Sequence, residues 1–307
     1  MLKKILETIE LLNCADVSGN KIVNWLRNAG ANAAHEILKD EKGSTDFIKV
    51  TIPGHQGQSS GGTAQTLGVI GRLGGIGCRP NRLGLVSDGD GAVVAIAVAA
   101  FLAQMRNHGD ILPGDVLIRT HISPNSPIIP HEPAAFVDLP IDRETLIRAE
   151  IDPTMNGILS IDSTRANRIA KQTGFGITGT IKEGVILRPT NGVLDIYERT
   201  AGQAPFVVPI FTQDITPPGN GLHHINSLLQ PATVTSVPVI GVALLSPIVT
   251  GGASTGVVKE TELSAAGHFV IEVAKEFTAG TLDLYHHDEF ELFINLYGSM
   301  KQLQEQR

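Results

Sequence analysis

The chain has 307 residues, with 24 Lys and Arg against 31 Asp and Glu, so its formal net charge is −7. Hydrophobic residues make up 42% of the chain and charged residues 18%, a composition that is too apolar for a disordered protein. The negative charge and the lack of a basic cluster exclude nucleic acid and anionic membranes as expected partners. The 33 glycines predict many turns, but they follow no Gly-X-Y repeat, which excludes a collagen-like chain.

The cysteines and the apolar stretches indicate a compartment. Cys14 and Cys78 are too few for a disulfide scaffold, so we expect reduced thiols in a cytoplasmic protein. Glu7 and Glu10 interrupt the N-terminal apolar residues, so we expect no signal peptide. The longest apolar stretch, residues 91–102, is shorter than the roughly 20 residues of a membrane-spanning helix, so we expect no membrane span.

Hydrophobic periodicity predicts helices and strands that alternate along the chain. The dense glycine cluster at residues 54–91 predicts a loop region between them. Such alternation is typical of an α/β protein, here a three-layer sandwich with a central mixed, largely parallel sheet and helices on both faces. We expect one domain over residues 1–307, with strands at 47–52, 116–120, 157–161, 206–211 and 237–244, and helices at 2–12, 22–26, 92–107, 163–172, 260–278 and 289–304.

Polar side chains follow the predicted strands, and open α/β sheets bind ligands at that edge. His55 and His121 come after the first two of these strands, Asp162 ends the third, and Asp214 follows the fourth. Asp88 stands just before the apolar helix. Imidazole and carboxylate groups are suitable ligands for Zn²⁺ or Mn²⁺. Each residue also has an ordinary explanation, because an aspartate caps helices well and a histidine is common in turns.

The order of these residues resembles that of the co-catalytic zinc aminopeptidases and related amidohydrolases. The resemblance rests on His55 in Ile52-Pro53-Gly54-His55, on Asp88 before the helix, and on the later carboxylate Asp162. It implies that these three residues bind metal, Zn²⁺ or Mn²⁺, with His121 in place of a lost glutamate.

Three positions depart from the aminopeptidase pattern. Gly57 stands where the pattern has an aspartate, His121 follows a strand that should precede a Glu-Glu pair, and residues 246–255 contain no late histidine. Glu132 is the nearest glutamate, so we assign it as the general base, with His121 as the other catalytic candidate. A standard two-zinc centre cannot be assembled from this set.

Over its whole length the chain resembles an uncharacterised bacterial family, the domain of unknown function 1177 family. The segments that carry this resemblance are Thr212–Gly221, Gly251–Gly256 and His121–Glu132. The family name implies no reaction.

Three hypotheses remain for the function. The first is a metal-dependent hydrolase that acts on a peptide or amide bond of a small substrate. The second is an inactive relative that binds a small molecule or short peptide, and the third is a structural or assembly protein. We expect a homo-oligomer. For the first two hypotheses we expect the substrate contacts to come from Asp214, His223, Ser254 and Thr255.

Overall fold

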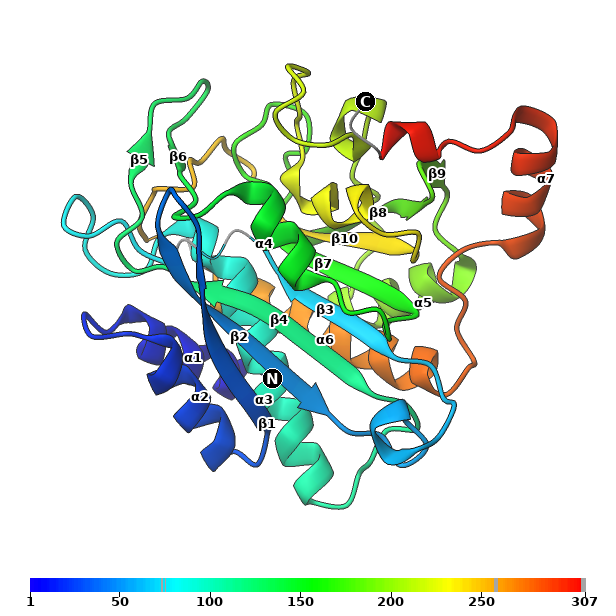
Figure 1. Ribbon diagram of the computed structural model, residues 1–307, viewed down its shortest axis with the longest axis horizontal. Coiled ribbons are helices and arrows are strands. Elements are labelled where there is room, and N and C mark those ends of the chain that lie inside the picture. Colours follow the sequence, from blue (N-terminus) through cyan, green and yellow to red (C-terminus); the bar gives the residue numbers. More distant parts are fainter. Residues whose placement is uncertain (73, 75, 257–258, 305–307) are drawn as a thin grey trace.

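The computed structural model describes residues 1–72, 74, 76–256 and 259–304. Its centre is an eight-stranded sheet in the order β1-β2-β4-β3-β7-β10-β8-β9 (Figure 1). The four middle strands run parallel to one another, and the strands on either side pair antiparallel. The bounds are β1 (Asn32–Lys39), β2 (Ser44–Ile52), β3 (Leu67–Gly71), β4 (Val116–Ile122), β7 (Gly157–Ser163), β8 (Phe175–Lys182), β9 (Val185–Leu187) and β10 (Val239–Leu244), with a separate hairpin of β5 (Ile128–Ile129) and β6 (Phe136–Val137).

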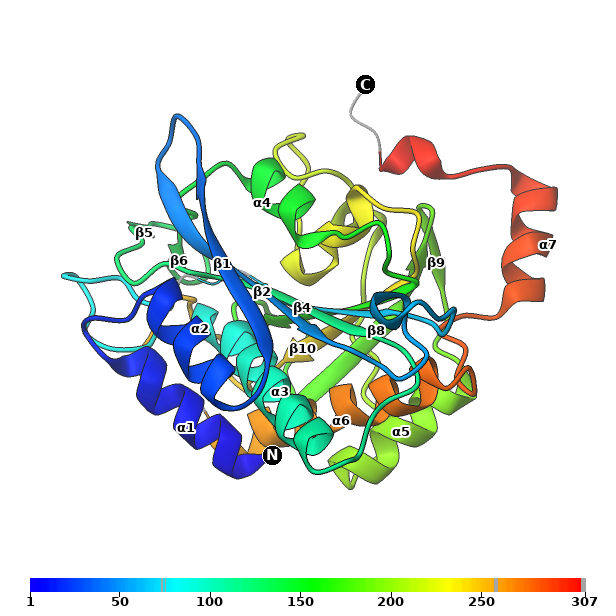
Figure 2. The same cartoon turned by 60° about the horizontal axis from the view of Figure 1, so that its bottom comes forward.

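Helices cover both faces of this sheet, which confirms the predicted α/β sandwich (Figure 2). One face carries α1 (Leu2–Asn13), α2 (Gly19–Asn28), α3 (Asp90–Asn107), α5 (Asn191–Ala201) and α6 (Glu260–Thr278). The other face carries α4 (Arg143–Glu150) and the 3₁₀ segment η4 (Ser227–Thr233), and α7 (His287–Tyr297) projects from the side of the body. The remaining 3₁₀ turns are η1 (Gln58–Ser60), η2 (Ser87–Gly89), η3 (Thr212–Ile215) and η5 (Lys301–Leu303).

Helix α3 is the centre of the hydrophobic core. Most of its Ala, Val, Ile and Leu side chains are buried, so the helix is apolar all round. It packs between α1 and α6 and against β3 and β4. Within the described residues, the stretch Ser87–Asn107 is the one helix long and apolar enough to cross a membrane, but 83% of its apolar 18-residue window is buried inside the protein, as in a core helix.

Strand β3 lies inside the glycine-rich region that the sequence predicted to be loop, so that prediction was wrong for residues 67–71. All five residues of β3 are buried between β4 and β7. Glycine is required here because α3 packs very close to the strand: a Cβ atom on Gly71 would lie 2.7 Å from the carbonyl oxygen of Gly91. Leu73 and Gly75 of the predicted loop region lie outside the described residues.

Two other predicted elements are absent from the described residues. The segment 206–211 forms one isolated bridge, Ile177 to Val207, instead of a strand. Pro205 and Pro209 flank this bridge, and proline cannot donate a backbone hydrogen bond to a neighbouring strand. Residues 164–172 are irregular instead of helical, because β7 continues to Ser163 and the chain then turns back toward β8.

Candidate functional site

Three buried polar residues meet at the carboxyl ends of the middle strands. Gly71 of β3 pairs with Thr120 of β4 on one side and with Ile161 of β7 on the other. The next residue of each strand segment is therefore at the same edge of the sheet, which places Arg72, His121 and Asp162 side by side. All three side chains are fully buried.

Asp88 and Asp162 form what we call the carboxylate pair. Asp88 lies on η2, where its N–H donates to Gly252 O (3.0 Å) and its carboxylate accepts from the Val137 N–H. Asp162 accepts from its neighbour Ser163 N (2.7 Å) and from Ser227 Oγ (2.5 Å) at the start of η4. Neither carboxylate forms an ion pair with any residue that the structure describes.

The pair is electrostatically costly because it is buried. Burial, followed by the charges of Asp162 and Asp90, raises the pKa of Asp88 well above its ordinary value. Burial raises the pKa of Asp162 to about 6, against the opposing effect of its hydrogen bond from Ser227. A cation between these groups would stabilise both charged carboxylates and offset the repulsion that acts on Asp88.

Asp90 begins α3 and has a different role from that of the carboxylate pair. Its Oδ2 atom forms a buried ion pair with Arg165, on the segment that follows β7. Burial raises the pKa of Asp90 to about 6, although the Arg165 charge acts in the opposite direction. This ion pair ties the N-terminus of α3 to the chain beyond β7.

Arg72 forms a second buried ion pair directly after β3. Its guanidinium donates to Glu150 Oε2 (2.5 Å) at the end of α4 and to Gln230 Oε1 on η4. Both Arg72 and Glu150 have no solvent exposure. Since α4 and η4 lie on the same face of the sheet, this network fastens them to the site (Figure 2).

His121 presents an unshared nitrogen inside the protein. Thr45 Oγ1 donates its proton to Ile122 O (3.0 Å), so it accepts from His121 Nδ1 (3.1 Å). The Nε2 atom then carries a lone pair, and it is buried without a hydrogen-bond partner among the described residues. Burial, with the charge of Arg72, lowers the pKa of His121 to about 3, so the ring is neutral.

Glu132 and His223, predicted as base and substrate contact, line one small pocket. The pocket has a volume of about 340 Å³ and also contains Phe136, which stacks on His131 with ring centroids 4.1 Å apart. Phe136 immediately precedes Val137, whose N–H reaches Asp88. The wall of this pocket therefore borders Asp88.

Ser254 is brought next to Asp88 by the loop after β10. Its carbonyl oxygen accepts from Ser87 N (2.9 Å), one residue before Asp88. The same loop presses Gly252 against the carboxylate of Asp88, where an added Cβ atom would lie 2.2 Å from Oδ2. Thr255, the other predicted contact of this loop, is exposed.

His55, predicted as a metal ligand, lies at the opposite edge of the sheet. Strand β2 runs antiparallel to β4, and its last residue, Ile52, pairs with the first residue of β4, Val116. His55 is exposed in the turn beyond this end, where its N–H donates to Leu112 O (2.9 Å). The structure therefore does not bring His55 together with the carboxylate pair.

Asp214, predicted as a substrate contact, is buried and satisfied by the protein itself. Its carboxylate accepts from the N–H groups of Ile225 (2.6 Å), Asn226 (3.0 Å) and Phe211 (3.0 Å). These bonds hold the turn that carries His223 against η3. Asp214 positions this turn and does not line the pocket.

The described part of the chain contains no group of three or more His, Cys, Asp or Glu side chains placed to share one metal ion. Of the predicted ligands, Asp88, Asp162 and His121 lie at the same edge of the sheet. They do not form a shared metal site among the described residues. The sequence missed Arg72, Glu150 and Arg165 as partners in this site. Arg72 could have been identified by its position directly after a strand. The sequence did not show that strand because the glycines of β3 predicted a loop.

Comparisons with known proteins give a family and a fold. A family model described as "Protein of unknown function (DUF1177)" matches residues 36–307. No curated protein matches the sequence. Among solved structures, "Bottromycin maturation enzyme BotP in complex with Mn" is similar with a TM-score of 0.50 and 13% identity, covering 87% of this chain and 70% of that one. The leucine aminopeptidase LAP1 of Caenorhabditis elegans is similar with a TM-score of 0.53 and 11% identity, covering 90% of this chain and 65% of that one.

Proposed function

The chain belongs to the DUF1177 family, and we propose that it is a metal-dependent hydrolase acting on a peptide or amide bond of a small substrate. The observation that carries the proposal is the carboxylate pair, Asp88 and Asp162, buried without an ion-pair partner among the described residues. Buried carboxylates are normally paired with a cation or bound to a metal. The similar structures support the same proposal, because BotP is named as a complex with Mn and LAP1 as an aminopeptidase.

The donor atoms of the pair fit a particular class of metal. Both ligands are carboxylate oxygens, which are typical ligands of Mn²⁺ and Mg²⁺, whereas zinc sites typically have nitrogen and sulfur ligands. The described residues supply no third carboxylate for the same ion, because Asp90 is held by Arg165. We therefore propose one Mn²⁺ ion in place of the two-zinc centre of the aminopeptidases, with water at the other positions.

The remaining residues have separate roles in this proposal. A bound divalent cation would polarise the substrate carbonyl and lower the pKa of a water molecule. Glu132 lies in the adjoining pocket and would accept the proton of that water. Phe136 and Ile225 supply apolar surface for the substrate side chain, and His223 lines the same pocket.

The test is metal binding, because it does not require the substrate. We expect protein purified without chelator or nickel resin to bind one Mn²⁺ per chain, measured by mass spectrometry and by titration. Asp88→Asn and Asp162→Asn should each weaken Mn²⁺ binding by about tenfold or more, since each removes one charged ligand. His55→Ala should leave the affinity unchanged, because His55 lies at the other edge of the sheet. Equal effects of His55→Ala and Asp88→Asn would contradict the assignment.

A binding protein without catalysis is the second candidate, and one observation favours it. The described residues lack the third shared ligand that hydrolytic metal centres usually have. Hydrolysis of aminoacyl-4-nitroanilides by the Mn²⁺-loaded protein distinguishes the two. Activity that is lost in Glu132→Gln, with Mn²⁺ affinity retained, supports the hydrolase. Mn²⁺ binding without hydrolysis of any of these substrates supports the binding protein.

A further inference from the structure

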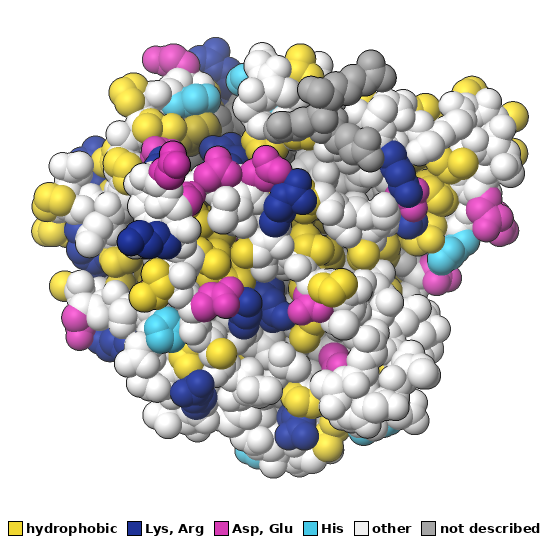
Figure 3. Space-filling view, viewed as in Figure 1, with side chains coloured by type: hydrophobic (Ala, Val, Ile, Leu, Met, Phe, Trp, Pro, Cys, Tyr) yellow, Lys and Arg dark blue, Asp and Glu magenta, His cyan; other side chains and the backbone are white. Residues whose placement is uncertain are grey.

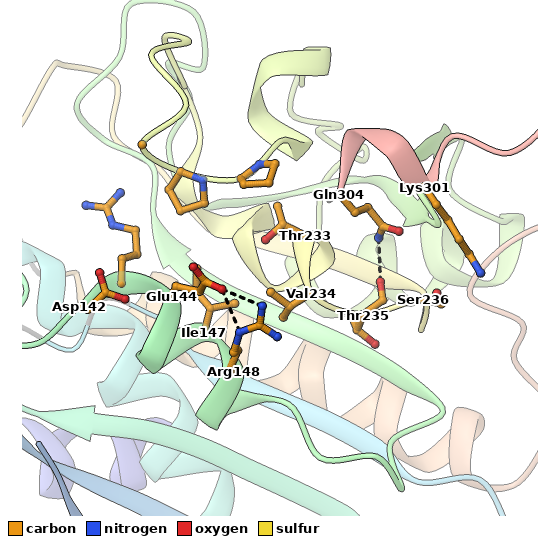
Figure 4. A pocket seen from close by; sticks show the side chains of 14 residues that line it. Asp142, Glu144, Ile147, Arg148, Thr233, Val234, Thr235, Ser236, Lys301 and Gln304 are labelled. Carbon is orange, nitrogen blue, oxygen red and sulfur yellow. Dashed lines mark hydrogen bonds and ion pairs between the residues drawn. The ribbon is translucent and has the colours of Figure 1, made fainter. Parts of the chain in front are cut away.

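The largest cavity among those described lies apart from the pocket of Glu132 and His223. It is a groove of about 950 Å³ between α4, the turn 217–219, the end of η4 and the segment of η5, and we call it the α4 groove. Figure 4 shows Asp142 at one end, Lys301 and Gln304 at the other, and the pair of Glu144 and Arg148 between them. It opens on the face of the molecule shown in Figure 3, where acidic and basic side chains are interspersed.

Most charged groups that line the α4 groove are already satisfied. Arg148 donates to Glu144 (2.7 Å), and Lys301 pairs with Glu183 (3.1 Å). Asp142 caps α4 by accepting from Thr145 N (3.1 Å). These groups do not need a ligand.

Arg143 is the exception. It lies on the wall of the groove as the first residue of α4 and is half-buried. Its guanidinium forms no hydrogen bond or ion pair with any residue in the described ranges. A guanidinium has five N–H donors, and leaving them without partners in a half-buried position is unfavourable.

The charge of Arg143 favours an anion over a neutral partner. Burial, followed by the charge of Arg72, lowers the pKa of Arg143, while the carboxylates of Asp138, Asp162 and Asp142 act in the opposite direction without forming an ion pair with it. Glu150 and Gln230 already accept the hydrogen bonds of Arg72. Arg143 has no such hydrogen-bonded acceptor among the described residues, and a planar oxyanion matches its donors in a two-point contact.

We propose that the α4 groove binds a small organic molecule through an oxyanion, a carboxylate or a phosphate, held by Arg143. The rest of the groove suits the body of such a molecule. Ile147 and Val234 offer apolar surface, and Thr233 and Ser236 offer hydroxyl groups. The site does not depend on a metal ion at the carboxylate pair, so it stands if the proposed hydrolase function fails.

The experiment measures binding to the full-length protein in EDTA by isothermal titration calorimetry. The probes are N-acetyl-leucylglycine, its C-terminal amide, and inorganic phosphate. We expect the acid to bind at least about tenfold more tightly than the amide, because a charge-assisted contact is lost in the amide. Phosphate competing with the acid identifies the oxyanion as the recognised group, and stronger binding of phosphate than of the acid identifies a phosphate ligand.

Arg143→Gln should weaken binding of the acid to the level of the amide. Arg148→Gln is the matched control, because Arg148 lines the same groove from the same helix and is already paired with Glu144. Its effect should be small. Arg143→Lys keeps the charge and loses the two-point contact, so it should bind with intermediate affinity, which separates recognition from misfolding. Equal affinities for acid and amide, equal losses in the Gln variants, or no binding of the acid or of phosphate would overturn the proposal.

Discussion

Replacing Glu150 by alanine is expected to lower the free energy of unfolding by about 3–5 kcal/mol. Glu150 and Arg72 are both fully buried, and their hydrogen bond measures 2.5 Å. Removing Glu150 leaves the Arg72 charge in the interior with Gln230 as its one remaining hydrogen-bond partner among the described side chains. The cost is large because a buried charge without its counter-ion can neither be solvated nor easily lose its proton.

Glu144→Ala is the control for this prediction. Glu144 is on the same helix and also pairs with an arginine, Arg148, but both side chains are at least half exposed. Exposed pairs contribute about 0.2–1 kcal/mol, so this variant should be nearly as stable as the wild type. Urea denaturation of both variants gives the comparison. Similar losses for Glu150→Ala and Glu144→Ala would show that the Arg72 pair is not buried as described.

The double variant Arg72→Met with Glu150→Leu tests whether the loss in Glu150→Ala comes from the unpaired charge of Arg72. Replacing a buried ion pair by apolar residues of similar size is often neutral or stabilising. The double variant should therefore be more stable than Glu150→Ala alone. A double-mutant cycle gives the coupling energy of the pair.

Replacing Asp162 by asparagine is expected to change how stability depends on pH. The folded-state pKa of Asp162 is raised to about 6 from 3.8, so the folded protein binds this proton more tightly than the unfolded chain does. The resulting stabilisation is present at low pH and is lost as the pH rises through about 6. Between pH 4.5 and 8 the wild type should lose about 2 kcal/mol through this group, and Asp162→Asn should not.

The measurement is urea denaturation at several pH values in EDTA, so that no metal ion contributes. Asp214→Asn is the control, because Asp214 is equally buried but accepts three backbone hydrogen bonds. Its amide would place N–H groups against N–H donors, so we expect a loss of about 2 kcal/mol or more at neutral pH. If the difference in unfolding free energy between wild type and Asp162→Asn stays constant with pH, Asp162 has no raised pKa.

In a second measurement, added Mn²⁺ should stabilise the wild type above pH 6 more than Asp162→Asn, because only the wild type keeps both carboxylates.

The hydrophobic pattern of the sequence predicts those helices and strands whose buried residues follow a regular spacing or form a continuous run. The apolar repeat of α3 and the Glu260–Thr278 helix were found with nearly their observed bounds. The strands β2, β4, β7 and β10 were found because each is a short run rich in Val, Ile and Leu. β3 was missed because its glycines, which let α3 approach the strand, are the residues that usually mark turns.

The sequence placed candidate site residues at the right edge of the sheet only on strands that run parallel, as it assumed for all of them. Asp162 and His121 lie at the expected edge of the sheet because β7 and β4 are parallel neighbours of β3. His55 was placed at the same edge by assuming that β2 also runs parallel, and β2 runs antiparallel. The direction of β2 follows from its pairing with β4, and this pairing joins residues that lie far apart in the sequence.

The sequence by itself determined the α/β class, the core helix α3 and the acidic residues that face the edge of the sheet, because these follow from local spacing and burial. Only the tertiary structure decided which charges are compensated. Arg72 meets Glu150 across 78 residues of chain, and Arg165 meets Asp90 across 75. No local pattern records such pairs, and Asp88, Asp162 and Arg143 are left without an ion pair among the described residues. Those three residues carry the proposals because the energy of a buried charge depends on its neighbours in space.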